Sequence, residues 1–290
     1  MSTCLSSTWR NPYLARSGPR DCARCIRDII NQGKAKRPQS DWVQTMYQVN
    51  NFTVLESVYG RFIVNRHCAF QAESLVKTGH PHIQHELNNI LALALNLPEH
   101  SVTIDAGANI GLVCVPVAQT VKAKGGTVHA FEIQRPLFYA LCGTAALNDL
   151  LNLHVHQMGL GAAPSVLSLA AIDYGVAQDF GVVSLVRQST GGEREAVTIT
   201  TIDALQLPRI DLLKVDVEGM EVDVLRGGRQ MIETFQPWAW VEHWISGIEA
   251  IKEQFVGLDY KFYRMDDLNM VCAPLSRIKE TQLQINAEEV

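Results

Sequence analysis

The chain has 290 residues, of which 47% are hydrophobic and 19% are charged. This length and composition suit a globular protein with either one large domain and an extension or two small domains. The formal net charge is −5. It argues against a nucleic-acid partner, because binding to phosphates is driven by a basic surface.

No apolar run approaches the roughly 20 residues that cross a bilayer, and the N-terminus lacks the basic and apolar stretches of a secretory signal. The seven cysteines are an odd, scattered set, which suits a reducing compartment. We therefore expect no membrane span and a cytoplasmic location. Cys22 and Cys25 form the only close pair. Because no further ligands follow at zinc-site spacing, no metal site is expected.

The first segment, residues 1–45, is polar and interrupted by proline and glycine, and is expected to form a loosely ordered arm. Residues 52–65 are rich in β-branched and aromatic side chains, which predicts a β-hairpin. Apolar side chains then recur at helical spacing from residue 82 to 97, before Pro98. Residues 46–100 are thus expected to form a hairpin and helix extension.

Residues 101–275 alternate short apolar strands with helical stretches and are expected to form the main domain. Strands are predicted at 102–105, 127–132, 153–158, 212–217, 238–242, 260–264 and 270–273. Helices are predicted at 111–122, 136–147, 219–234 and 248–255. This alternation, with strands that are apolar throughout, predicts an α/β fold with a Rossmann-like, doubly wound, mostly parallel sheet. Ligands of such sheets bind at the carboxyl ends of the strands.

Two segments depart from this alternation. Residues 165–202 contain three short strand patterns, at 166–171, 182–186 and 197–201, and predict an antiparallel addition at the edge of the main sheet. Residues 276–290 are polar and are expected to form a C-terminal tail.

The strongest local signal is the run DAGANIG, which follows an apolar strand and contains Asp105, Gly107, Asn109 and Gly111. Its glycines allow a sharp turn and close approach to a ligand, and free N–H groups at a helix start suit an anion. Asp105 is suited to hold a cationic amine, so a zwitterionic methionine moiety fits better than a bare phosphate. A dinucleotide-binding G-x-G-x-x-G loop would need glycine at Asn109 and Leu112. A tight turn alone would also explain the glycines.

Glu132 closes the second strand of the main domain. An acid at this place accepts hydrogen bonds from ribose hydroxyls. Dinucleotide enzymes use the same device, so Glu132 favours a nucleoside-bearing cofactor without naming it. The alternative interpretation is an ordinary surface acid at a strand end.

The run KVDVEGME places Asp216 and Glu218 where the fourth strand meets a helix. In a doubly wound sheet this strand neighbours the first one, so both acids are expected to face the cofactor site. There they would bind the acceptor or act as general base, although helix capping is an alternative role. His243 follows the next strand and is a second candidate base, but a lone histidine beside Trp244 is more often a packed residue.

Together these motifs resemble the FkbM-type methyltransferases, over roughly residues 57–273. The matching pieces are DAGANIG, AFE at 130–132, KVDVEGME at 214–221, and Glu242 with His243. The resemblance implies a Rossmann-like methyltransferase fold and methyl transfer from S-adenosylmethionine, usually to a hydroxyl of a sugar, polyketide or similar small molecule. Two departures are Ile133, where the family often has proline, and Met220, where it has a smaller residue.

Carried over to this chain, the resemblance assigns the methionine end of the cofactor to Asp105, Gly107, Asn109 and Gly111. It assigns the ribose to Glu132 and the adenine to Met158 and Gly159. We therefore expect an O-methyltransferase that uses S-adenosylmethionine and a hydroxylated small-molecule acceptor, with no nucleic-acid partner. An NAD-dependent oxidoreductase and a non-catalytic nucleoside-binding module with the same fold are the alternatives.

Overall fold

The computed structural model describes residues 51–182, 192–281 and 287–290. The arm expected at 1–45 lies outside the described residues, and so does most of the strand expected at 182–186. In the described part of the chain, no helix is long and apolar enough to cross a membrane.

The centre of the molecule is an eight-stranded sheet in the order β13-β11-β12-β10-β9-β3-β4-β5. Its bounds are β3 Val102–Ala106, β4 Thr127–Phe131, β5 Leu153–His156, β9 Leu212–Val215, β10 Trp238–Glu242, β11 Tyr260–Arg264, β12 Asn269–Pro274 and β13 Glu288–Glu289. The five strands β5, β4, β3, β9 and β10 pair in parallel, whereas β12 is antiparallel to both β10 and β11. The chain order reverses between β3 and β9, so the predicted Rossmann-like, doubly wound α/β sheet is confirmed.

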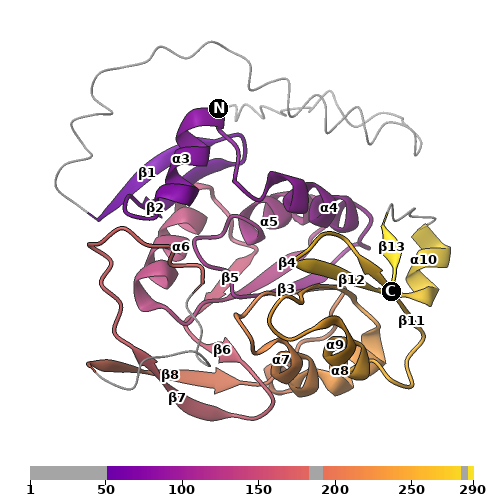
Figure 1. Ribbon diagram of the computed structural model, residues 1–290. Coiled ribbons are helices and arrows are strands. Elements are labelled where there is room, and N and C mark those ends of the chain that lie inside the picture. Colours follow the sequence, from indigo (N-terminus) through magenta and orange to yellow (C-terminus); the bar gives the residue numbers. More distant parts are fainter. Residues whose placement is uncertain (1–50, 183–191, 282–286) are drawn as a thin grey trace, which may run out of the picture. The chain divides into compact units, whose positions relative to one another are not determined.

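Helices cover both faces of this sheet (Figure 1). One face carries α4 (Gln84–Leu95), α5 (Cys114–Lys122) and α6 (Arg135–Leu147), and the other carries α7 (Glu221–Gly227), α8 (Arg229–Phe235) and α9 (Ile248–Glu253). Strand side chains alternate between these layers. In β9, Leu212 packs in the core between the sheet and helices α4, α5 and α6, whereas Leu213 packs in the core between the sheet and helices α7, α8 and α9. The single helix predicted at 219–234 is interrupted at Gly228, where α7 ends and α8 begins.

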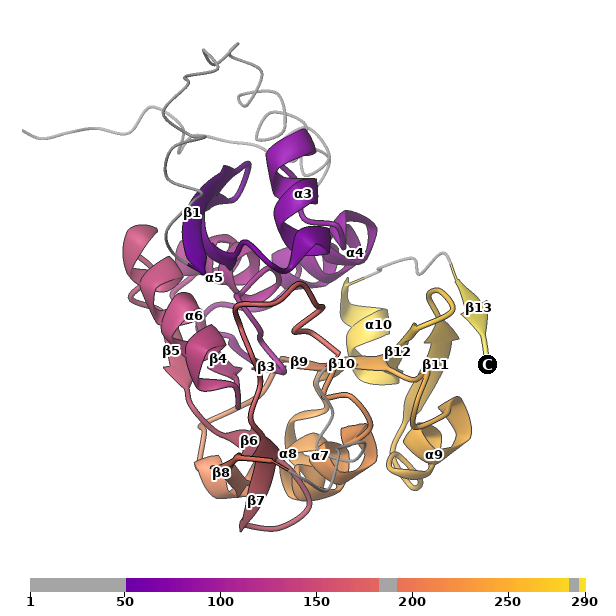
Figure 2. The ribbon, with the colours of Figure 1, turned by 60° about the vertical axis from the view of Figure 1, so that its left-hand side comes forward.

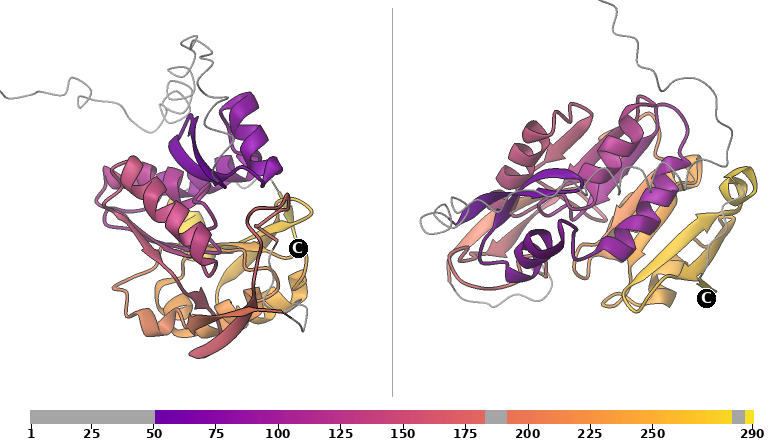
Figure 3. Two further views of the ribbon diagram at one scale, coloured as in Figure 1. Left: turned by 90° about the vertical axis from the view of Figure 1, so that its left-hand side faces the viewer. Right: turned by 90° about the horizontal axis from the view of Figure 1, so that it is seen from above.

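The predicted hairpin is present as β1 (Phe52–Ser57) and β2 (Gly60–Asn65), paired antiparallel. Helix α3 (Ala69–Thr78), which was not predicted, follows it. The hairpin is held against α6 by two hydrogen bonds from β2. The Ile63 amide donates to Thr144 Oγ1 at 3.0 Å, and the Arg61 amide donates to Asn148 Oδ1 at 2.9 Å. Figures 2 and 3 show hairpin and α3 on the side of the sheet that carries α5 and α6.

The segment between β5 and β9 differs from its prediction. β6 (Gly159–Leu160), β7 (Ser165–Ala170) and β8 (Arg194–Thr200) form a separate sheet in the order β6-β8-β7, instead of an addition to the main sheet. A Cβ on Gly227 would lie 2.0 Å from the Gly161 carbonyl oxygen. The chain after β6 therefore packs directly on α7, which draws it away from the edge strand β5.

The C-terminal residues also differ from the expected tail. Residues Leu275–Thr281 form helix α10, and β13 pairs antiparallel with β11, with Glu289 opposite Tyr263. Arg277 holds the start of this segment, since its guanidinium lies 3.0 Å from Asp211 Oδ1 and donates to the Phe235 carbonyl oxygen at 2.9 Å.

Candidate active site

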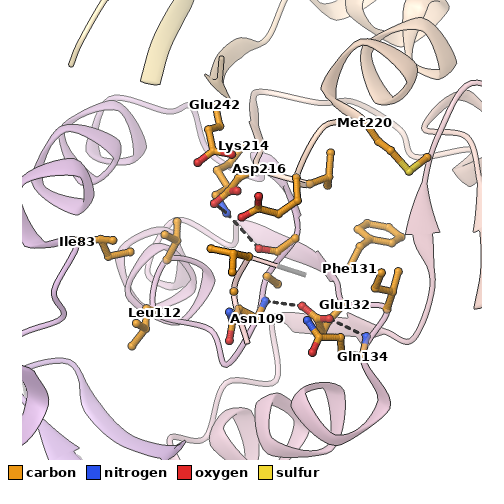
Figure 4. A pocket seen from close by; sticks show the side chains of 18 of the residues that line it. Ile83, Asn109, Leu112, Phe131, Glu132, Gln134, Lys214, Asp216, Met220 and Glu242 are labelled. Atoms are coloured by element: carbon orange, nitrogen blue, oxygen red, sulfur yellow. Dashed lines mark hydrogen bonds and ion pairs between the residues drawn. The ribbon is translucent and has the colours of Figure 1, made fainter. Parts of the chain in front are cut away.

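A cavity of about 300 Å³ lies at the carboxyl ends of β3, β4, β9 and β10 (Figure 4). Residues of helix α4 and of the segment after β5 close its other sides. Most of the residues predicted as the site line it: Gly107, Asn109, Glu132, Met158, Gly159, Asp216 and Glu218. Asp105, Gly111 and His243 are not among its lining residues. Both family departures, Ile133 and Met220, line it as well.

The turn after β3 brings the ends of β3 and β9 unusually close together. Gly107 has a φ of +82°, and a Cβ there would lie 1.8 Å from the Asp216 carbonyl oxygen. Only glycine permits this approach. The Gly107 and Ala108 amides donate to the Phe131 carbonyl oxygen at 3.0 and 2.9 Å, so the turn is also tied to the end of β4. The helix expected from residue 111 begins only at Cys114.

Glu132 is buried, with 5% of its surface exposed, so it is not a surface acid. Its Oε2 accepts from the Asn109 amide at 2.8 Å and its Oε1 accepts from the Gln134 amide at 2.7 Å (Figure 4). Burial raises the pKa of Glu132 to about 7, although the two backbone N–H groups favour the carboxylate. The side chain thus holds the turn at Asn109, where φ is +50°, while each oxygen keeps a lone pair for a ligand hydroxyl.

Asp105 occupies a different place from the one predicted. It is 1% exposed, and its Oδ1 lies 3.3 Å from the Lys214 ammonium. Burial raises the pKa of Asp105, while Lys214 acts to lower it. Asp105 thus pairs with the protein's own lysine and does not line the cavity, and its contact with the cofactor stays a prediction. Gly111 is also behind the cavity wall, and a Cβ there would lie 2.5 Å from Leu141 Cδ1.

Lys214 is the centre of an ion-pair network on the floor of the cavity (Figure 4). Besides Asp105 it contacts Asp216 Oδ2 at 3.1 Å, and it donates to the Gly107 carbonyl oxygen at 3.1 Å. Burial acts to lower the pKa of Lys214, but the carboxylates of Asp105, Asp216 and Glu86 outweigh this and raise it. Lys214 is therefore a permanent cation that fixes Asp216 and the turn at Gly107.

Three carboxyl groups meet at one side of the cavity. Oxygens of Asp216, Glu218 and Glu242 lie within 4.8 Å of one another. Burial, and then the charge of Asp216, raises the pKa of Glu218 to about 7. Burial, Asp216 and Glu218 raise the pKa of Glu242 to about 9. The raised pKa favours the protonated form of Glu242 at neutral pH, which has an O–H to donate.

His243 does not face the cavity. It is 7% exposed, and its buried Nε2 has no hydrogen-bond partner among the described residues. Successive side chains along a strand point to opposite faces, so Glu242 at the end of β10 and His243 after it point apart. Glu242 therefore lines the cavity and His243 does not, and the catalytic role of His243 stays a prediction.

Sequence reasoning also missed Glu86, which reaches the cavity from helix α4. Burial raises the pKa of Glu86 to about 7, although Lys214 acts to lower it. The sequence shows an acid between apolar helix positions. It does not show that this helix lies over the carboxyl ends of strands more than a hundred residues away.

The family model of the Methyltransferase FkbM domain matches residues 105–267. Methyltransferase 1 of Beauveria bassiana (strain ARSEF 2860) is 28% identical over 149 residues, covering 45% of this chain and 59% of the relative. Methyltransferase sdnD of Sordaria araneosa is 28% identical over 181 residues, covering 49% and 69%. The chain thus spans 59% of the first relative's length and 69% of the second's.

Solved structures with similar folds include the methyltransferase FkbM of Methylobacillus flagellatus KT, with a TM-score of 0.46 and 17% identity, covering 61% of this chain and 44% of that one. A SAM-dependent O-methyltransferase of Thermotoga maritima has a TM-score of 0.43 and 10% identity, covering 82% and 85%. The family model spans more than half of the 290 residues. The protein therefore belongs to the FkbM methyltransferase family.

Proposed function

We propose that this protein is an S-adenosylmethionine-dependent methyltransferase that methylates a hydroxyl group of a small molecule such as a sugar or a polyketide. The observation that carries the proposal is the cavity at the point where the strand order reverses, with the glycine turn after β3 and Glu132 after β4 on its wall. Open α/β sheets bind their ligands at this point.

The residues present fit the cofactor. Gly107 and Asn109 line the cavity where the methionine end would lie. Glu132 has acceptor capacity left for the ribose hydroxyls, and Met158 and Gly159 line the cavity where the adenine would lie. Asp105 acts as a positioning residue, because it reaches this region only through Lys214. When bound, S-adenosylmethionine supplies an activated methyl carbon.

The acceptor lies, in this proposal, beside the three carboxyl groups. Asp216 is the base that takes the proton of the acceptor hydroxyl, and its ion pair with Lys214 keeps its carboxylate in place. Glu242, protonated at neutral pH, donates a hydrogen bond that orients the acceptor. Glu86 faces the same space from α4. The protein contributes alignment, proximity and proton removal.

Calorimetric titration with S-adenosylhomocysteine and NAD in parallel tests the cofactor. We expect S-adenosylhomocysteine to bind in the micromolar range and NAD not to bind. Binding of NAD alone to the folded protein would favour the oxidoreductase alternative and would overturn the proposal.

A screen of hydroxylated and aminated small molecules for methyl transfer then tests the reaction. Methylation of hydroxylated compounds is the expected result. If S-adenosylhomocysteine binds but no compound of either class is methylated, the chain is better described as a nucleoside-binding module. Methylation of amines alone would replace the O-methyltransferase proposal with N-methylation.

A further inference from the structure

Three histidines share one face of the two strands at the edge of the main sheet. His154 and His156 are two residues apart on β5, so their side chains point the same way. His129 on β4 stands opposite His154 in the parallel register. None of these residues was singled out by the sequence, because their proximity depends on the pairing of strands that are far apart in the chain.

The imidazole rings are already close together. His129 Nδ1 and His156 Nε2 lie 3.2 Å apart, and the ring centroids of His129 and His154 are separated by 4.8 Å. Two nitrogens bound to one tetrahedral zinc ion at 2.0–2.1 Å would be about 3.3–3.4 Å apart. The first pair therefore has almost the spacing of two ligands. The His154 ring is stacked on that of His129 at an interplanar angle of 19°, so a side-chain rotation of His154 is needed for it to become the third ligand.

This face is accessible, and it is separate from the cavity described above. The opposite face of the same strands, with Val128, Ala130 and Leu153, packs in the core with α5 and α6. On the histidine face, His154 is exposed and the other two rings are half-buried. Among the described residues β5 is the edge strand of the main sheet, and the chain continues from it into the small sheet of β6, β7 and β8. The rings are available to a ligand from solvent.

We propose that His129, His154 and His156 form a binding site for a divalent metal ion such as Zn²⁺, with the three imidazoles as its ligands. Imidazole nitrogens suit Zn²⁺, Ni²⁺ and Cu²⁺, whereas Mg²⁺ and Ca²⁺ prefer oxygen. Three histidines and a water molecule are a known zinc coordination set. On binding, the ring that donates the hydrogen bond between His129 and His156 exchanges its proton through solvent to its other nitrogen. Each neutral ring then binds the metal through an unprotonated nitrogen, and the hydrogen bond is replaced by two metal bonds.

A hydrogen-bonded imidazole pair without metal affinity is the competing explanation of the same geometry. The two explanations differ in the role of His154. It takes no part in the hydrogen bond between the other two histidines, but it is a ligand in the proposed site. Because it is exposed, its replacement leaves the fold intact and isolates its contribution.

The test is a calorimetric titration of the full-length chain, carrying no affinity tag, with Zn²⁺ and then with Ni²⁺. We expect one ion per chain, and we expect His129→Ala, His154→Gln and His156→Ala each to weaken binding at least ten-fold. His85→Ala is the matched control, since His85 is an exposed histidine on α4 far along the chain from this face, and it should leave the affinity unchanged. Circular dichroism checks that each variant is folded.

Two further variants test whether zinc binds at one of two other places in the protein. Glu242→Gln removes a carboxylate from the acidic side of the cavity, and a Cys22→Ser, Cys25→Ser double variant removes the close cysteine pair. Unchanged Zn²⁺ affinity in both supports the histidine site. The proposal is overturned if zinc binding survives in His154→Gln and His156→Ala, if it is lost in either of these further variants instead, or if wild-type protein binds neither metal.

Discussion

At the scale of single residues, Glu132 shows how burial changes the role of a side chain. An acid at a strand end facing a ligand would be expected to contribute little to stability. Here the carboxylate accepts from two backbone amides, those of Asn109 and Gln134, and is nearly inaccessible. The same group therefore shapes the cofactor pocket in the absence of any ligand.

Glu132→Ala is predicted to lower both stability and cofactor affinity. Two buried amides lose their acceptor, so the free energy of unfolding should fall by about 1–3 kcal/mol. S-adenosylhomocysteine should bind at least ten-fold more weakly. Chemical denaturation and calorimetry measure the two effects, with exposed Glu99→Ala as control. Unchanged stability would mean that the turn at Asn109 holds itself without Glu132.

Asp216 and His243 provide a second pair for comparison. If Asp216 is the base, Asp216→Asn should lower turnover by roughly 100-fold while S-adenosylhomocysteine affinity stays nearly the same, as expected when general-base assistance is removed. His243→Gln is the matched control, because His243 does not line the cavity. Turnover measured with an acceptor from the screen decides. A large loss in His243→Gln with none in Asp216→Asn would reverse the assignment.

At the scale of elements, strand positions were predictable and strand ends were not. β3 and β9 are short apolar runs bounded by turn residues, so the sequence indicates them directly. β9 was expected to continue to residue 217 but ends at Val215, because the chain turns where Gly107 approaches Asp216. That contact joins two turns distant in the sequence, and no local pattern records it.

Gly107→Ala is predicted to damage this junction between β3 and β9. A Cβ would lie 1.8 Å from the Asp216 carbonyl oxygen, so the two strand ends must separate. Gly257→Ala is the matched control, since its φ of +83° is nearly that of Gly107 and nothing lies within 4 Å of its Cβ position. The control should lose about 1–2 kcal/mol through backbone strain.

We expect Gly107→Ala to lose clearly more stability than this control, together with its affinity for S-adenosylhomocysteine. Thermal and chemical unfolding of the two variants measure the difference, which isolates the steric contact from the cost of the backbone conformation. Equal losses in both variants would show that the strand ends separate without cost.

At the scale of the whole molecule, the site joins parts of the chain that the sequence presents as separate. Glu132 and Asp216 could be placed at the cavity because each follows a strand whose neighbours could be inferred from the topology. Glu86 was not found, because its helix precedes the main domain and only packing places it over the strands. His243 was the candidate and Glu242 its neighbour in the sequence, and only the pleat of β10 decides which one faces the cavity.

The carboxyl groups that meet at the cavity predict that the stability of the folded protein falls as the pH rises. Four carboxyl groups at the cavity have raised pKa values, about 7 for Glu86, Glu132 and Glu218 and about 9 for Glu242. Burial is the largest cause for each of them. In the unfolded chain such groups lose their protons near pH 4.3, whereas the folded protein keeps them. These four groups bind more protons in the folded state and act to lower stability as the pH rises. Burial lowers the pKa values of His82, His129 and His156, which act in the opposite direction, but the carboxyl groups are more numerous.

We predict that the free energy of unfolding of the ligand-free protein decreases by about 1 kcal/mol or more per pH unit between pH 5 and 7. It should continue to decrease, less steeply, up to pH 9, since only Glu242 still carries its extra proton there. Denaturant titrations at several pH values measure the slope. Glu242→Gln should remove most of the decrease between pH 7 and 9 and should also make the curve shallower between pH 5 and 7, because Glu242 carries its extra proton over the whole range while the three others remain. A stability that rises between pH 5 and 7 would mean that these carboxyl groups are ionised in the folded protein, and Glu242 would then have no proton to donate to an acceptor.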